Sequence, residues 1–196
     1  MTQATLSART AVLRPAIDAD IDAICTIWHN GWRDGHLGHV PAALLRHRRL
    51  DDFRVLVPAR LDTTTVATIG FGVVGFVTLH DEEIEQIYVD ASSRGTGVAN
   101  ALLAHGETVI RARFDRAWLA VVAGNARARR FYERNGWSDT GPIVNPAPTA
   151  EGASIPVPAR RYEKRLTPNV VPSATHEPTG RTTVPTSRKE DGAPRL

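Results

Sequence analysis

The feature that most constrains the fold is the segment Arg94-Gly95-Thr96-Gly97-Val98-Ala99, which lies between a strand-like run at 84–89 and a helical run that begins near residue 98. Two glycines in a turn that enters a helix leave several backbone N–H groups uncovered, and the helix start adds a partial positive charge. Gly97 has no Cβ to hold a diphosphate away from these amides, and the Arg94 guanidinium can add a charge-assisted contact. Taken alone, such a turn is more often ordinary loop chemistry, so the phosphate interpretation depends on its surroundings.

The length and composition favour one globular domain. The chain has 196 residues, a formal charge of +3 and one cysteine, Cys25, which lies at helical spacing among apolar residues and is expected in the core. No basic run interleaves with aromatic residues, so we expect no nucleic-acid partner. The sequence shows no apolar leader and no run of about 18 apolar residues, so we expect no membrane association and a cytoplasmic location.

The pattern along the chain predicts a single domain over residues 10–166. Residues 1–9 are polar and expected to be flexible, whereas 167–196 lack aromatic residues, are rich in Pro and Thr, and are expected to form a disordered tail. The stretch 31–39 is rich in Gly, His and Trp, and a Pro/Gly segment at 145–158 is expected to separate the last two strands. The expected strands lie at 10–14, 64–69, 73–80, 83–90, 117–122, 137–144 and 159–166, and the expected helices follow Asp18, Pro41 and Asp51 or Asp52, begin near Val98, and span 125–135.

Two motifs in this order resemble those of a known family. The first is Ile87-Tyr88-Val89 followed by Arg94-x-x-Gly97-x-Ala99, which is similar to a [QR]-x-x-G-x-[GA] pyrophosphate loop. The second runs from Trp118-Leu119-Ala120-Val121-Val122-Ala123-Gly124-Asn125 through Phe131-Tyr132-Glu133 to Gly136-Trp137. Over residues 10–166 the chain therefore resembles the GNAT superfamily of acyl-CoA-dependent N-acetyltransferases. The resemblance implies an α/β fold in which a central, mixed and twisted sheet is flanked by helices.

The resemblance also implies acetyl-CoA as cosubstrate, held mainly by the backbone. The loop amides would hold the diphosphate, and the preceding strand would pair with the pantetheine while the Val89 amide polarises the thioester carbonyl. Asn125 is a helix cap in the ordinary interpretation and a cofactor contact by resemblance. The implied cofactor-binding set is Ile87, Tyr88, Val89, Arg94, Gly95, Thr96, Gly97, Val98, Ala99, Asn100 and Asn125.

Tyr132 and Glu85 are the candidate catalytic residues. By resemblance Tyr132 protonates the departing thiolate, although an aromatic residue packed under the sheet is the ordinary interpretation. A tyrosine with a pKa of about 10 is a poor donor to a thiolate of about 8.5, and Arg129 one turn earlier could lower the tyrosine pKa. Glu85 is the candidate base that deprotonates the amine, with Glu83, water, or no role beyond an exposed strand charge as alternatives.

The sequence defines the binding site for the acceptor amine less well than the cofactor site. By resemblance the acceptor site lies between the first two helices, which carry Trp28, Trp32, His36 and His39, and a late flap at 145–159. Members of the family that acetylate protein N-termini often carry a glutamate where this chain has Ala120, which weakly argues against that substrate class. No cysteine or carboxylate near the two histidines completes a ligand set, so we expect no metal.

The leading hypothesis is an N-acetyltransferase that moves an acetyl group from acetyl-CoA to a primary amine by direct attack in a ternary complex. The acceptor could be a small-molecule or protein amine, and a homodimer is one option for the assembly. The alternative is a non-catalytic acyl-CoA-binding regulatory module on the same fold. A third hypothesis, a binding module for another nucleotide, is disfavoured because Val98-Ala99 replaces the Lys-[Ser/Thr] of a P-loop.

Overall fold

The computed structural model describes residues 10–167, so the predictions for 1–9 and for nearly all of 167–196 lie outside the described residues. Within the described range, no helix is both long and apolar enough to cross a membrane. The elements in chain order are β1 (Val12–Pro15), η1 (Asp18–Asp20), α1 (Ile21–His36), α2 (Ala42–Leu45), α3 (Leu50–Leu56), η2 (Pro58–Thr63), β2 (Thr64–Ile69), β3 (Gly72–His80), β4 (Glu83–Val89), η3 (Ala91–Ser93), α4 (Val98–Arg111), β5 (Arg116–Val121), α5 (Ala126–Arg134), β6 (Ser138–Pro148) and β7 (Ser154–Arg165).

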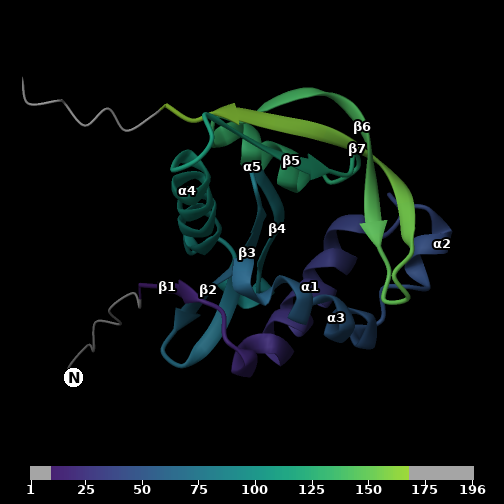
Figure 1. The fold of residues 1–196 in the computed structure, drawn as a ribbon, viewed down its shortest axis with the longest axis horizontal. Coiled ribbons are helices and arrows are strands. Elements are labelled where there is room, and N and C mark those ends of the chain that lie inside the picture. The colour runs from purple at the N-terminus through teal and green to yellow at the C-terminus, as the bar shows by residue number, and fades with distance from the viewer. Residues whose placement is uncertain (1–9, 168–196) are drawn as a thin grey trace, which may run out of the picture.

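Seven strands form one sheet in the order β1-β2-β3-β4-β5-β7-β6 (Figure 1). Every neighbouring pair is antiparallel except β4 and β5, which run parallel. These two strands are in register only at Glu83 and Trp118, where the Trp118 N–H donates to the Glu82 carbonyl at 3.0 Å. Beyond this point the sheet opens between β4 and β5. The mixed sheet flanked by helices that the sequence predicted is confirmed.

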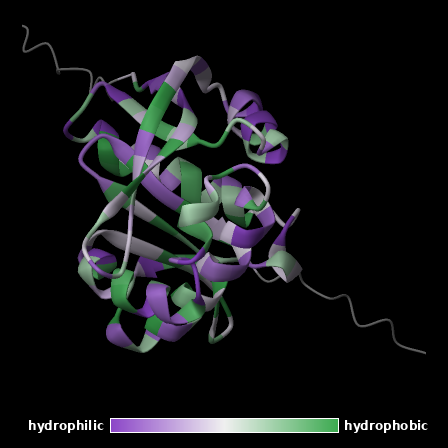
Figure 2. Cartoon of the chain, turned by 90° about the vertical axis from the view of Figure 1, so that its right-hand side faces the viewer, coloured by the Kyte–Doolittle hydropathy of each residue, from purple (hydrophilic) through white to green (hydrophobic). Residues whose placement is uncertain are grey.

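The sheet separates two apolar cores, because successive strand residues point to opposite faces. On β3, Val77 packs in the core that α4 and α5 cover, whereas its neighbour Phe76 packs in the core beneath α1 and α3. Hydrophobic and hydrophilic segments accordingly alternate along the helices and strands in Figure 2. In α4 the face that packs on the sheet includes Leu103 and Ile110, which are buried, whereas Val109 is 46% exposed.

Helix α1 continues through most of the Gly/His/Trp-rich stretch, as far as His36. The glycines allow close approach: a Cβ on Gly31 would lie 2.5 Å from Cδ1 of Tyr88, and one on Gly35 would lie 2.7 Å from Nδ2 of Asn125. The helix therefore passes tightly over β4 on one side of the opening and over the residue that precedes α5 on the other.

The Pro/Gly segment at 145–158 is also regular, because β6 and β7 form one long hairpin instead of ending before a flap. Pro146 pairs with Pro156, and neither residue has an N–H, so this is a non-hydrogen-bonded pair. By strand alternation the pair Val144 and Pro158 is of the same kind. The prolines therefore remove no bond between β6 and β7, and Figure 1 shows the hairpin arching from β5 toward α2.

Candidate active site

Two cavities meet at the opening between β4 and β5. We call them the loop cleft, about 370 Å³, which reaches the glycine segment, and the inner cavity, about 650 Å³, which lies beneath α1 and the β6–β7 hairpin. Both are lined by the same residues at the opening, which are Ile87, Tyr88, Asn125, Ala128 and Tyr132. A ligand that crosses the sheet at this opening can therefore contact both cavities.

The glycine segment presents free backbone amides to the loop cleft. Gly95 and Gly97 have φ of +78° and +91°, a left-handed conformation that favours glycine, and Gly97 caps α4 without a side-chain partner. A Cβ built on either glycine meets no atom within 4 Å, so there is open space beside the amides. Thr96 donates to the Ser93 carbonyl at 2.6 Å and Val98 is buried, so these two predicted residues can contribute only backbone groups.

The loop cleft is positively charged. Arg94, Arg127 and Arg134 line it, and none of its described lining residues is acidic. Arg94 is partly engaged, because its Nη2 donates to Oδ2 of Asp34 on α1 at 2.7 Å. Sequence reasoning missed Arg127 and Arg134, although their spacing of seven residues places them on one face of α5 and was a usable signal.

The backbone of β4 offers hydrogen-bond donors to the opening. The Asp90 N–H donates to the Val74 carbonyl at 2.8 Å, toward β3. Since successive N–H groups of a strand alternate in direction, those of Val89 and Ile87 point away from β3 and into the opening. An extended ligand can therefore add to β4 as an extra strand, as predicted for a pantetheine chain.

Asn125 and Ala128 form the start of α5. The Asn125 Oδ1 accepts from the Ala128 N–H at 3.1 Å, which confirms the predicted cap. The Nδ2 end of Asn125 lies against Gly35 of α1. Because Asn125 also lines both cavities, the cap and a ligand contact are compatible roles.

Tyr132 lies at the passage between the two cavities, with only 7% of its surface exposed. Burial, and secondarily the nearby Tyr88, raise the pKa of Tyr132 above its ordinary value. The expectation that Arg129 lowers this pKa is wrong. Arg129 instead donates from Nε to the Tyr162 hydroxyl at 3.0 Å and pairs with Asp139 at 3.5 Å.

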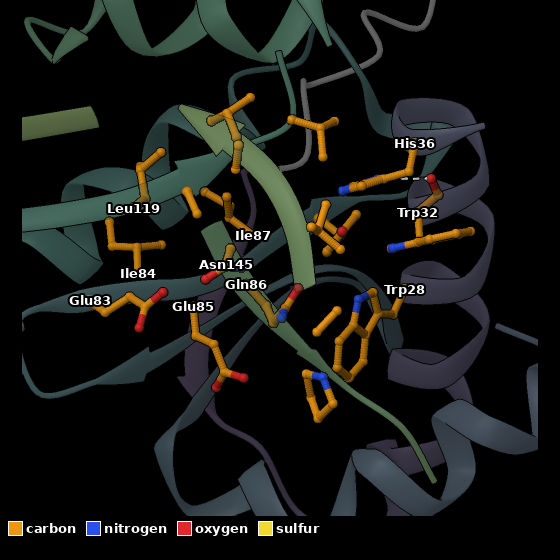
Figure 3. Close-up of a pocket in the computed structure, with 18 of the residues that line it drawn as sticks. Trp28, Trp32, His36, Glu83, Ile84, Glu85, Gln86, Ile87, Leu119 and Asn145 are labelled. Atoms are coloured by element: carbon orange, nitrogen blue, oxygen red, sulfur yellow. Dashed lines mark hydrogen bonds between the residues drawn. The ribbon is translucent and has the colours of Figure 1, made fainter. Parts of the chain in front are cut away.

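The two candidate bases differ in their partners. A β-bulge makes Glu85 the extra residue of β4, between Gln86 opposite Thr78 and Ile84 opposite Leu79. Glu85 accepts from Nε of Arg60 at 2.8 Å, whereas the Glu83 carboxylate has no hydrogen bond or ion pair within the described residues. Burial, followed by the charge of Glu85, raises the pKa of Glu83 to about 7. Figure 3 shows both carboxylates in the inner cavity.

The family model for the Acetyltransferase (GNAT) family matches residues 21–137, a span that includes α1 and the opening and ends just before β6. The chain belongs to the GNAT acetyltransferase family. Among curated proteins, no sequence matches this GNAT chain. Within residues 10–167, no group of three or more His, Cys, Asp or Glu side chains is arranged to hold a metal ion.

Solved structures share the GNAT fold at low identity. A GCN5-related N-acetyltransferase from Rhodopseudomonas palustris is 17% identical with a TM-score of 0.63, covering 83% of this chain and 100% of that chain. An N-acetyltransferase from Staphylococcus aureus Mu50 is 20% identical with a TM-score of 0.61, covering 80% and 99%. The yncA protein of Salmonella typhimurium, solved with its cofactor acetyl-CoA, is 19% identical with a TM-score of 0.59, covering 84% and 98%.

Proposed function

We propose that this GNAT protein is an N-acetyltransferase that moves an acetyl group from acetyl-CoA to a primary amine by direct attack in a ternary complex. The observation that carries the proposal is the passage at Tyr132. It joins a cleft with free amides and three arginines to a cavity with a carboxylate whose pKa lies near neutrality.

The loop cleft fits the acyl-CoA that the family uses. The amides of the glycine segment and the arginines of α5 would hold the diphosphate, because both donate to anionic oxygens. The Ile87 and Val89 N–H groups would bind the pantetheine arm and the thioester carbonyl. Acetyl-CoA supplies the thioester that serves as acyl donor. The neighbour structure that contains acetyl-CoA supports this assignment for the fold.

Glu83 is the better base for the acceptor amine. The sequence favoured Glu85, but its carboxylate is engaged in an ion pair with Arg60. Glu83 is free of such a partner among the described residues, and its pKa of about 7 lets it exchange a proton at neutral pH. We therefore assign to Glu83 the removal of a proton from the ammonium group, directly or through one water.

Tyr132 acts on the leaving group. Its raised pKa keeps the hydroxyl protonated at neutral pH, so the O–H can donate a hydrogen bond to the thiolate as it departs. The same raised pKa makes complete proton transfer harder than from an ordinary tyrosine. Stabilisation of the thiolate by hydrogen bonding is therefore the main contribution that we assign to Tyr132.

An acetyl-CoA-dependent thiol-release assay against grouped amines tests the proposal. The expected result is amine-dependent release of free CoA with at least one group of small-molecule or protein amines. Tight acetyl-CoA binding without release for any amine would instead favour the non-catalytic regulatory module. Calorimetry with acetyl-CoA and with ATP separates the transferase and the regulatory module, which should prefer acetyl-CoA, from a binding module for another nucleotide. The cytoplasmic location and the homodimer stay predictions.

A further inference from the structure

The inner cavity contains a second polar region, away from the two glutamates. Arg48, between α2 and α3, lines the cavity and is only 7% exposed. Its Nη1 donates to the carbonyls of His47 at 2.7 Å and Pro148 at 3.0 Å, and its guanidinium lies 5.6 Å from the centre of the Trp32 ring. No carboxylate within residues 10–167 forms an ion pair with Arg48. The cavity therefore holds a buried cation without a counter-ion.

Trp28 adds an unsatisfied donor to the same region. Its side chain is 4% exposed and lines the inner cavity, and its Nε1 has no hydrogen-bond partner among the described residues. Tyr88 lies nearby, with its ring centre 6.4 Å from that of Trp28; a weak side-chain hydrogen bond from the Trp28 indole and the charge of Arg48 both oppose the burial that raises the pKa of Tyr88. No hydrogen bond of regular geometry joins Trp28 to Tyr88. A buried N–H without an acceptor is unfavourable unless a ligand supplies one.

Arg48 also has free donors beside the cavity that it lines. Both of its hydrogen bonds use Nη1, so Nη2 and Nε have no partner within the described residues. A guanidinium presents these N–H groups in a fixed plane that matches the two oxygens of a carboxylate. Arg48 and Trp28 together thus offer a cation and N–H donors where the described residues provide no anion.

The opposite end of the cavity has the reverse character. Figure 3 shows Glu83 and Glu85 on one side and Trp28, Trp32 and His36 on the other. Burial lowers the pKa of His36 to about 4, so this ring is neutral at physiological pH and adds no charge. Glu85 is paired with Arg60, whose guanidinium lies 5.9 Å from the centre of the Trp28 ring. The charges of the cavity without an ion-pair partner among the described residues are therefore Glu83, where β4 pairs with β5, and Arg48. A polyamine would place a positive group beside Arg48, which is unfavourable.

We propose that the amine acceptor carries a carboxylate, which Arg48 and the Trp28 indole N–H bind while its amino group faces Glu83. The inference rests on the proposed function, because it assigns the acceptor class of the same site. Both groups of the ligand must lie within one cavity of about 650 Å³, which points to a small amino-acid-like molecule instead of a protein side chain.

The test compares matched acceptors in the thiol-release assay. A panel of free amino acids is measured beside their carboxamides and methyl esters, which keep the amine but lack the anion. The free acids should have kcat/KM values at least about tenfold higher than their amides, since a charge-assisted hydrogen bond is at stake. The amides and esters have the more easily deprotonated amines, so greater intrinsic reactivity cannot explain a preference for the acids. Equal or better turnover of the amides, or turnover only of peptide and protein amines, would overturn the inference.

Variants test whether Arg48 binds the substrate carboxylate or only packs against the β6–β7 hairpin. Arg48→Met should remove the preference for acids over amides, chiefly by raising the KM of the acids. Trp28→Phe should also reduce the preference for acids over amides. Arg54→Met is the matched control, because Arg54 is an exposed arginine that pairs with Asp22 and Asp51. A loss that is equal for acids and amides would mean that Arg48 only holds the hairpin in place, and would contradict the proposal.

Thermal melting gives a readout independent of turnover. Free amino acids that are substrates should raise the melting temperature of the wild-type protein more than their amides do, and Arg48→Met should abolish the difference. Such a shift without thiol release for any amine would retain the carboxylate site and reject the transferase. If CoA thiol is released but free acids and amides do not differ in kcat/KM or in melting-temperature shift, the transferase proposal stands and the carboxylate site is rejected.

Discussion

The loop cleft and the inner cavity meet at Tyr132 but are built in different ways. The loop cleft is formed by one continuous stretch of chain, from β4 through the glycine segment, with α5 beside it. Its main donors are backbone amides exposed by two left-handed glycines. The inner cavity is assembled from side chains of α1, the α2–α3 segment, β4, β5 and the β6–β7 hairpin. None of these contributors shares a local sequence motif with the others.

This difference separates a general ligand site from a selective one. A backbone site binds any molecule with the same diphosphate and amide chain, and it tolerates changes in most side chains. A side-chain cavity changes its specificity with single substitutions, because each charge or donor has one position. We therefore expect variants of the inner cavity to affect acceptor kinetics alone, and variants of the loop cleft to affect acetyl-CoA affinity alone.

The largest effect is expected for Glu83→Gln, which removes the proposed base from the inner cavity. We expect kcat/KM for the amine to fall about 100-fold at pH 7, with acetyl-CoA affinity unchanged. In the wild type, kcat/KM should rise with pH through about 7, because Glu83 accepts a proton only once it is ionised. The variant should lack this inflection. Glu85→Gln is the matched control, and a larger loss there would restore the original assignment.

Tyr132→Phe tests the passage between the loop cleft and the inner cavity, because Tyr132 lines both. The change removes one hydroxyl and keeps the ring that packs between Phe131 and Trp137. We expect kcat to fall about tenfold, with little change in the Kd of acetyl-CoA, because the hydroxyl acts on the leaving thiolate. Stopped-flow or steady-state kinetics with calorimetry measure the two quantities. Unchanged kcat would remove Tyr132 from the mechanism.

A smaller and more local effect is expected for Gly97→Ala in the loop cleft. The left-handed φ of +91° disfavours a Cβ, and the new methyl group would stand in the open space beside the amides. We expect the Kd of acetyl-CoA to rise about tenfold while the KM of the amine is unchanged. Gly152→Ala is the matched control, because Gly152 also has a left-handed φ, +80°, and open space but lies in the β6–β7 turn. Equal effects of the two variants on affinity would argue against a diphosphate site.

The smallest expected effect concerns stability. The pKa of Glu83 is raised in the folded protein, so the folded state binds the proton more tightly than the unfolded state does. Folding stability should therefore decrease as pH rises from about 4.5 to 7. Glu83→Gln removes this penalty and should increase the free energy of unfolding by about 1 kcal/mol at pH 8, with no gain below about pH 4. Urea denaturation at the two pH values measures it, and a destabilised variant at pH 8 would contradict the burial of this charge.

The sequence predicted the elements around the loop cleft well, because their signals are local. The strands 64–69 and 83–90, the helix after Gly97 and the cap at Asn125 all correspond to observed elements. Elsewhere tertiary contacts override a local signal. Gly31 and Gly35 have a low intrinsic helix propensity, yet they lie inside α1, where Tyr88 and Asn125 pack against them. The prolines of β6 and β7 indicated a loop, yet they occupy pairs that need no N–H.

The sequence by itself determined the fold family and the glycine segment proposed to bind a diphosphate, since φ, helix capping and strand alternation act over a few residues. Only the tertiary structure decided which carboxylate is free, because Arg60, distant in sequence, neutralises Glu85 and leaves Glu83 buried without a partner among the described residues. Likewise only the tertiary structure brought Arg48 and Trp28 to one wall of the inner cavity. Burial and ion pairing depend on which distant segments meet, and these contacts decide the chemistry of the acceptor side.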